Sequence, residues 1–200
     1  MRHLVFTNNQ RIEKDPKLFS LEREAEVNIY TTLGTHILDN NAQALLHLDL
    51  HLERLIENAK SIELENKELK EHSSAYIESK LLEELNNYPE KDKRLRVRVI
   101  LNKNGIEITI QELIPFWDST KRIKLKSVLA IRPNPECKTT AIAESAQARE
   151  IANKQDCEEA ILLDESGYVT ECAYSNIFWF SKDGSLYTPK SKLLPGITRH

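Results

Sequence analysis

Lys138 is the residue of this sequence best suited to covalent chemistry. It stands in a loop with Pro133 and Pro135, after a segment expected to be a strand and before one expected to be a helix. A lysine can attack an aldehyde when burial or a neighbouring cation lowers its pKa toward neutrality. Taken alone, a lysine near a helix start is more often an ordinary surface residue, so the rest of the sequence has to decide.

Cysteine chemistry is not indicated by this sequence. Cys137, Cys157 and Cys172 form no CxxC pair and are odd in number. This pattern favours reduced thiols over a disulfide framework or a zinc site. Cys137 adjoins Lys138, which could make it reactive, but we expect a buried structural thiol there.

Residues 158–199 carry a much more specific signal. They read EEAILLDESGYVTECAYSNIFWFSKDGSLYTPKSKLLPGITR. This string resembles, motif by motif, the C-terminal domain of the class IV aminotransferases, which are fold type IV pyridoxal 5′-phosphate (PLP) enzymes. The resemblance implies a two-domain α+β protein with mixed and antiparallel sheets and flanking helices. It also implies PLP as the cofactor, a small amino acid and a 2-oxo acid as substrates, and a homodimer.

The same resemblance assigns roles to individual residues. Lys138 would carry PLP as a Schiff base, and Glu171 would face the pyridine nitrogen. A carboxylate there keeps that nitrogen protonated, so that the ring can accept electrons. The loop at 194–198 would bind the phosphate, with the amides of Ile197 and Thr198 donating at the start of a helix.

The resemblance is weaker in the N-terminal half. The segment His51-Leu52-Glu53-Arg54-Leu55 is similar to the family's "H..RL" helix, so Arg54 would reach the phosphate with a planar guanidinium. The family's "GdgvFET" strand is replaced by residues 26–32, which lack its glycines. Tyr30 and Thr32 share one face of this strand and could line the substrate site, although ordinary strand packing explains them equally well.

Three functions remain open at this stage. The first is an aminotransferase in which Lys138 moves a proton at the substrate α-carbon. The second is a 4-amino-4-deoxychorismate lyase, which eliminates pyruvate to leave 4-aminobenzoate. It is favoured by Ala143, where branched-chain enzymes typically place a tyrosine, and by Tyr30-Thr31-Thr32 and Lys138-Thr139-Thr140, which resemble its "FTT" and "KTT". The third is a non-catalytic relic, because family members continue well past the phosphate loop.

Periodicity predicts the elements that must position these residues. We expect an N-terminal domain over 1–113, a linker at 114–121 and a C-terminal domain over 122–200 that is truncated at its end, with the cofactor between the domains. Helical spacing marks 48–62, 69–85 and 141–154, whereas strands are predicted at 4–6, 27–33, 43–46, 94–99, 106–110, 123–131, 160–163, 168–170, 177–180 and 186–187. Strands and helices occur in groups along the chain and do not alternate one by one, which favours an α+β architecture. The absence of GxGxxG disfavours a Rossmann fold.

Charge and hydropathy restrict the classes of partner that the sequence predicts. The 28 basic and 31 acidic residues are mixed along the chain, so no basic face indicates a nucleic acid or an anionic membrane. No apolar run approaches the roughly 20 residues of a membrane span, and the start lacks a signal peptide, so we expect a cytoplasmic protein. Arg96 or Arg98 could bind a substrate carboxylate, although charged residues on the solvent face of a hairpin are the simpler interpretation.

Overall fold

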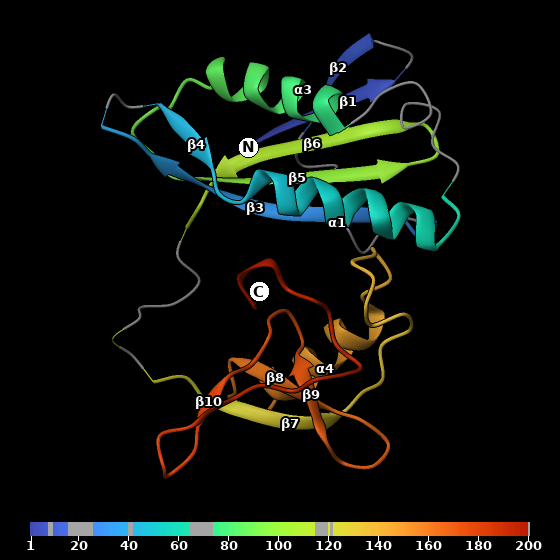
Figure 1. Ribbon diagram of the computed structural model, residues 1–200, viewed down its shortest axis with the longest axis vertical. Coiled ribbons are helices and arrows are strands. Elements are labelled where there is room, and N and C mark those ends of the chain that lie inside the picture. Colours follow the sequence, from blue (N-terminus) through green and yellow to red (C-terminus); the bar gives the residue numbers. More distant parts are fainter. Residues whose placement is uncertain are drawn as a thin grey trace. The chain divides into compact units, whose positions relative to one another are not determined.

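The chain divides into two compact units in the computed structural model (Figure 1). The structure describes residues 1–7, 10–15, 26–39, 42–64, 74–114, 120 and 122–199. Unit 1 consists of Met1–Pro115 together with Lys138–Thr140, and unit 2 consists of Phe116–Cys137 and Ala141–His200. Lys138 therefore groups with the N-terminal part of the chain, although it lies far along the sequence.

Unit 1 is built on a six-stranded sheet in the order β2-β1-β6-β5-β3-β4. Every neighbouring pair in it is antiparallel. The strands are β1 (Arg2–Thr7), β2 (Gln10–Lys14), β3 (Ile29–Ile37), β4 (Gln43–Leu45), β5 (Leu95–Asn102) and β6 (Gly105–Glu112). The β5–β6 turn requires glycine at 105, where φ is +151° and a Cβ would overlap the carbonyl oxygen of Phe6.

Two helices, α1 (Leu48–Ser61) and α3 (Ser74–Asn86), cover one face of this sheet (Figure 1). Apolar residues recur three or four positions apart on each helix and are at most 3% exposed: Leu52, Leu55, Ala59, Ile77, Leu81 and Leu85. They pack against strand residues of the same core cluster, such as Leu33 and Val97. Each fully buried aliphatic side chain of this kind stabilises the fold by roughly 1.5–3 kcal/mol.

The opposite face of the sheet carries polar side chains, because residues alternate between the two faces of a strand. Tyr30 and Thr32 of β3 lie on this face, opposite Ile100 and Arg98 of β5 in the antiparallel register. The alternating arginines of β5 therefore belong to the face that the helices leave uncovered.

The segment Lys138–Thr140 extends the edge of β3. The amide of Tyr30 donates to the carbonyl of Lys138 at 3.0 Å, and the amide of Thr140 donates to the carbonyl of Asn28 at 2.9 Å. Thr139 forms an isolated antiparallel bridge with Ile29. These backbone bonds hold Lys138 at the sheet edge as if it were the end of a short strand.

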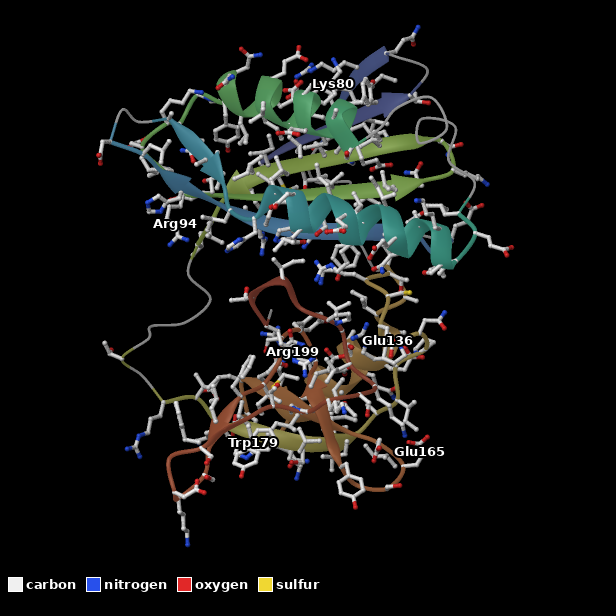
Figure 2. All side chains as sticks on the ribbon, viewed as in Figure 1. Lys80, Arg94, Glu136, Glu165, Trp179 and Arg199 are labelled. Atoms are coloured by element: carbon white, nitrogen blue, oxygen red, sulfur yellow. The ribbon has the colours of Figure 1, made fainter. Side chains whose placement is uncertain are left out.

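Unit 2 contains a smaller mixed sheet in the order β7-β8-β9, formed by Leu125–Leu129, Glu159–Leu163 and Val169–Cys172. Strands β7 and β8 are parallel, and the helix α4 (Ala143–Asn153) connects them, whereas β8 and β9 are antiparallel. Ala148 and Ala152 of α4 pack with Ala160 and Leu162 of β8. A two-stranded ribbon, β10 (Trp179–Phe180) and β11 (Leu186–Tyr187), completes the unit, and Trp179 stacks on Tyr187 with ring centroids 6.1 Å apart (Figure 2).

The structure differs from the expectations at a few places. Strand β2 was not predicted because its five residues, Gln10–Lys14, are all exposed and show no apolar alternation. The predicted helix at 69–85 is described from Ser74 onward, and its first residues lie outside the described part of the chain. Most of the predicted linker, at 115–119 and 121, also lies outside the described residues. Within the described residues, no helix is both long enough and apolar enough to cross a bilayer.

Candidate active site

The backbone of Lys138 is held on two sides within unit 1. Its amide donates to the side-chain oxygen of Asn58, on the last turn of α1, at 2.8 Å. Its carbonyl accepts from the amide of Tyr30 at 3.0 Å. A catalytic group has to be held within a fraction of an ångström to react efficiently, and these bonds supply such support from a helix and a strand.

The side chain of Lys138 lies against an aromatic ring and near a second cation. Lys138 Nζ is 4.7 Å from the centroid of the Tyr30 ring, and Arg98 Cζ is 5.7 Å from the same centroid. Arg98 also donates from Nε to the hydroxyl of Thr32 at 3.2 Å. The pKa of Arg98 is lowered, mainly because burial disfavours its charge, so this arginine is not a freely solvated residue of a hairpin.

Arg54 forms a second cationic position in unit 1. It projects from α1 and donates from Nη2 to Thr31 Oγ1 at 3.2 Å. Burial lowers the pKa of this guanidinium as well. Burial, together with the charges of Arg54 and Lys138, lowers the pKa of His51 to about 4, so His51 is neutral at pH 7. Partly buried guanidinium groups and an amine suit an anionic ligand, since an anion offsets the cost of removing their charges from water.

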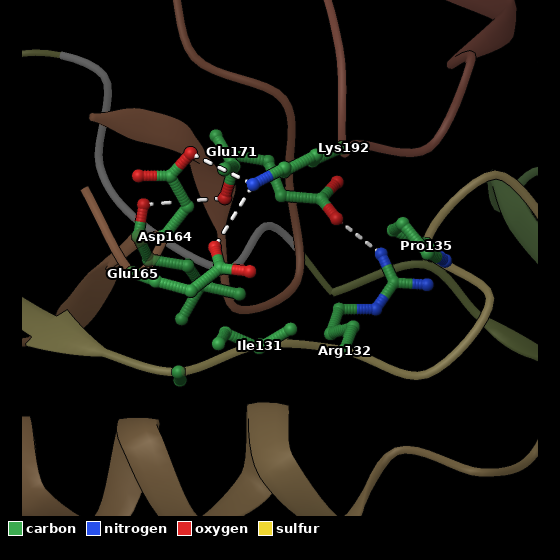
Figure 3. Close-up of a pocket in the computed structure, with 10 residues that line it drawn as sticks. Ile131, Arg132, Pro135, Asp164, Glu165, Glu171 and Lys192 are labelled. Atoms are coloured by element: carbon green, nitrogen blue, oxygen red, sulfur yellow. Dashed lines mark hydrogen bonds and ion pairs between the residues drawn. The ribbon is translucent and has the colours of Figure 1, made fainter. Parts of the chain in front are cut away.

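Glu171 is a buried carboxylate of unit 2. It lies on β9 with its side chain 5% exposed and forms an ion pair with Arg132 Nη1 (Figure 3). Its second oxygen accepts from the backbone amide of Leu194 at 3.2 Å. Two donors therefore hold the carboxylate in place, and one of them comes from the start of the 194–198 loop.

A cavity of about 190 Å³ adjoins Glu171 in unit 2 (Figure 3). On one side Lys192 forms ion pairs with Asp164 at 3.1 Å and with Glu165 at 2.9 Å. The lining residues are Ala130, Ile131, Arg132, Pro135, Leu162, Asp164, Glu165, Thr170, Glu171 and Lys192. Within the described residues, no group of three or more acidic, histidine or cysteine side chains is arranged to hold a metal ion.

The loop at 194–198 has a shape that depends on glycine. A Cβ at Gly196 would overlap the side-chain oxygen of Asn176, whose amide nitrogen donates to the carbonyl of Leu194 at 2.9 Å. The loop continues into a single 3-10 turn, Ile197–Arg199, and Arg199 donates to the carbonyl of Pro189 (Figure 2). Thr198 is exposed in this turn.

The structure brings some of the predicted residues together within each unit. Lys138 contacts Tyr30 in unit 1, and both Lys138 and Arg54 lie close enough to His51 to lower its pKa. Thr32 shares the face of Tyr30 but contacts Arg98. In unit 2, Glu171 is bonded to the loop that holds Ile197 and Thr198, neither of which lines the cavity.

Several residues of the site were missed or misjudged from the sequence. Asn58 lies four positions after Arg54 on the same helix face, a signal that could have found it. Arg132 has no such local signal, because its partner Glu171 lies 39 positions away. Cys137 was expected to be buried, but it is half-buried, in a loop whose residues 131–138 are all exposed or half-buried.

Comparison with known proteins identifies the family. The sequence model described as amino-transferase class IV matches residues 29–200. The chain belongs to the class IV aminotransferase family. The family expected from the motifs in 158–199 is therefore confirmed.

Individual relatives extend this finding. A stretch of 43 residues is 54% identical to a probable branched-chain-amino-acid aminotransferase of Rickettsia bellii (strain RML369-C), covering 21% of this chain and 14% of the relative. The branched-chain aminotransferase of Thermoproteus uzoniensis with norvaline superposes with a TM-score of 0.81 at 18% identity, over 98% of this chain and 72% of that protein. The T.th. branched-chain amino acid aminotransferase with pyridoxamine 5′-phosphate superposes with a TM-score of 0.78 at 21% identity, over 100% of this chain and 72% of that protein.

A structure assigned provisionally as a 4-amino-4-deoxychorismate lyase also matches this class IV chain. Its TM-score is 0.70 at 23% identity, over 86% of this chain and 67% of that protein. At such identities a structural likeness establishes the shared fold alone, and fold type IV is confirmed on this basis.

Proposed function

We propose that this chain is a PLP-dependent aminotransferase that moves an amino group between an amino acid and a 2-oxo acid, with Lys138 as the residue that carries the cofactor. The observation that supports this most is that two hydrogen bonds hold the backbone of Lys138, while its side chain shares the Tyr30 ring with the guanidinium of Arg98. A surface lysine would need no such support. The family membership and the T.th. structure with pyridoxamine 5′-phosphate favour PLP as the group that Lys138 serves.

The residues fit the chemical parts of this cofactor. PLP supplies an aldehyde that bonds to amines and a ring that accepts electrons from the substrate α-carbon. Arg54 is proposed as a phosphate ligand, and so are the amides of Ile197 and Thr198. Glu171, held by Arg132, would accept a hydrogen bond from the protonated pyridine nitrogen.

The chain's own groups then perform proton transfer and substrate binding. Lys138 Nζ would take the proton from the substrate α-carbon and later return one, acting as general base and general acid. Arg98 would bind a carboxylate of the substrate, since its guanidinium lies near the Tyr30 ring that Lys138 Nζ also approaches. Tyr30 and Thr32 would line the same wall. Homodimer formation and a cytoplasmic location are proposed from the family resemblance.

Pyruvate elimination, as in a 4-amino-4-deoxychorismate lyase, is the second candidate. The position five residues after Lys138 is Ala143, at the start of α4, so no phenolic hydroxyl is available from it. The hydroxyl of Thr32 is instead held beside Arg98 on the face of Tyr30. Release of pyruvate from aminodeoxychorismate without any amino acceptor would favour this lyase activity. Amino-group exchange that requires a 2-oxo acid would favour the transaminase.

The test of the cofactor role is borohydride reduction after incubation with PLP, followed by peptide mass spectrometry. We expect one phosphopyridoxyl adduct, at Lys138, which the Lys138→Ala variant loses. The matched control is Lys154→Ala, because Lys154 is an exposed lysine whose side chain is 72% accessible, and this variant should label normally. Labelling scattered over exposed lysines, or labelling that survives Lys138→Ala, would contradict the proposal.

A further inference from the structure

The hydroxyl of Thr31 joins two side chains of α1. Thr31 is fully buried on β3, with 0% of its surface exposed. Its Oγ1 is 2.7 Å from His51 Nδ1 and 3.2 Å from Arg54 Nη2. His51 and Arg54 are three positions apart on the helix and therefore point to the same side. One hydroxyl oxygen of the sheet thus contacts two polar side chains of α1.

The donor fixes the direction of one of these hydrogen bonds, and the tautomer of His51 sets the direction of the other. A guanidinium only donates, so Thr31 Oγ1 accepts from Arg54. The single hydroxyl hydrogen of Thr31 can be donated to His51 Nδ1, and in that arrangement Nδ1 is the acceptor. A neutral imidazole that accepts at Nδ1 carries its proton on Nε2. The charges facing His51 come from Arg54, Lys138, His47 and Asp49, and all but Asp49 disfavour a second proton on the ring.

We infer that Thr31 is a positioning residue for Arg54. Its oxygen orients the guanidinium by accepting from Nη2. His51, with its proton on Nε2, accepts the hydroxyl hydrogen of Thr31 at Nδ1, so that the lone pairs of the threonine oxygen face Arg54. The inference rests on the proposed function, in which Arg54 binds the cofactor phosphate. A residue that acts in this way affects binding of the phosphate and leaves binding of the rest of the cofactor unchanged.

The test compares two aldehydes that differ only in the phosphate. PLP and pyridoxal are titrated into the 200-residue chain, and imine formation is followed by absorbance, for the wild type, Thr31→Val and Thr31→Ser. Valine keeps the shape but removes the hydroxyl, whereas serine keeps the hydroxyl. We expect Thr31→Val to weaken PLP binding about tenfold, as the loss of one charge-assisted hydrogen bond would, and to leave pyridoxal binding unchanged. Thr31→Ser should restore PLP binding.

The outcomes separate this inference from the proposed function. A wild type that binds PLP no more tightly than pyridoxal would overturn the phosphate role of Arg54, and the inference would fail with it. A wild type that prefers PLP, together with a Thr31→Val variant that keeps the same preference, would overturn only the role of Thr31. Equal weakening of both aldehydes would also overturn it, since that result indicates general damage to the fold.

A second measurement needs neither the cofactor nor a substituted protein. Nitrogen-15 NMR of the cofactor-free wild type reports which ring nitrogen of His51 carries the proton. We expect a protonated Nε2 and an unprotonated Nδ1 at pH 7. A proton on Nδ1 would contradict the inference, because the Thr31 hydroxyl would then have to accept from both neighbours and could not be oriented by His51.

Discussion

Burial has opposite effects on the pKa values of two residues beside the proposed cofactor-binding groups, yet it favours the neutral form of both. It lowers the pKa of the His51 imidazole to about 4, and it raises the pKa of the Cys172 thiol to about 11. His51 lies beside Arg54, and Cys172 follows Glu171 directly in β9. At pH 7 neither residue therefore places a charge of its own beside Arg54 or Glu171, the proposed ligands of the phosphate and of the ring nitrogen.

The depressed pKa of His51 predicts an acid-sensitive stability. An ordinary histidine in the unfolded chain binds a proton below about pH 6.5, whereas His51 in the folded chain remains neutral down to about pH 4. The unfolded state therefore gains protons first as the pH falls. We expect the free energy of unfolding of unit 1 to fall between pH 6.5 and 4, by up to about 3 kcal/mol, and to level off below pH 4.

Urea unfolding across this pH range measures the effect. His51→Asn keeps a polar group but does not titrate, so it should remove most of the slope of the unfolding free energy against pH. The matched control is His36→Gln, because His36 is exposed on β3. An unchanged slope in His51→Asn would show that other groups cause the acid sensitivity.

At the scale of elements, one carboxylate joins the edge of the sheet to a helix. Glu84 of α3 is 2% exposed and accepts from Arg11 of β2 at 2.5 and 3.1 Å. Arg2 of β1 adds an ion pair at 3.3 Å. Strand β2 has no buried residue of its own, so these bonds and its pairing with β1 hold it in place.

Glu84→Gln should therefore destabilise unit 1 by about 2 kcal/mol, because two arginines lose a charged acceptor that the fold has removed from water. The neighbouring Glu83→Gln is the matched control. Glu83 is 53% exposed and pairs only with Lys80 among its described contacts, at i,i+3, so its loss should cost less than about 0.5 kcal/mol. Equal costs for the two variants, measured by urea unfolding, would contradict this account of how β2 is held.

The elements also show what the sequence could and could not predict. Helices α1 and α3 and the β5–β6 hairpin were predicted because their apolar residues repeat with the period of the element that buries them. Strand β2 lacks that repeat. Among the site residues, the short motifs allowed Lys138 and Glu171 to be singled out, but their partners Asn58 and Arg132 belong to elements distant in sequence. Such contacts depend on the tertiary arrangement, which periodicity does not encode.

At the scale of the whole molecule, the chain returns to unit 1 after it has entered unit 2. Residues 138–140 belong with Met1–Pro115, whereas the residues on both sides of them belong to unit 2. The return is held by bonds from Asn28 and Asn58, which are 112 and 80 positions away from their partners. The same three residues include the proposed catalytic lysine. The bonds that hold this short segment in unit 1 are therefore also the bonds that support Lys138.

The contact of Asn58 can be removed without altering the backbone pairing. Asn58→Ala deletes the acceptor of the Lys138 amide and leaves the bond from Tyr30 to the Lys138 carbonyl in place. We expect hydrogen exchange at the Lys138 amide to become about fivefold faster, since one net hydrogen bond contributes about 1 kcal/mol to local stability. Asn153→Ala, at the exposed end of α4, is the matched control and should leave that amide unchanged. If Asn58→Ala also left the exchange unchanged, the pairing with β3 alone would hold the segment, and α1 would have no part in positioning the lysine.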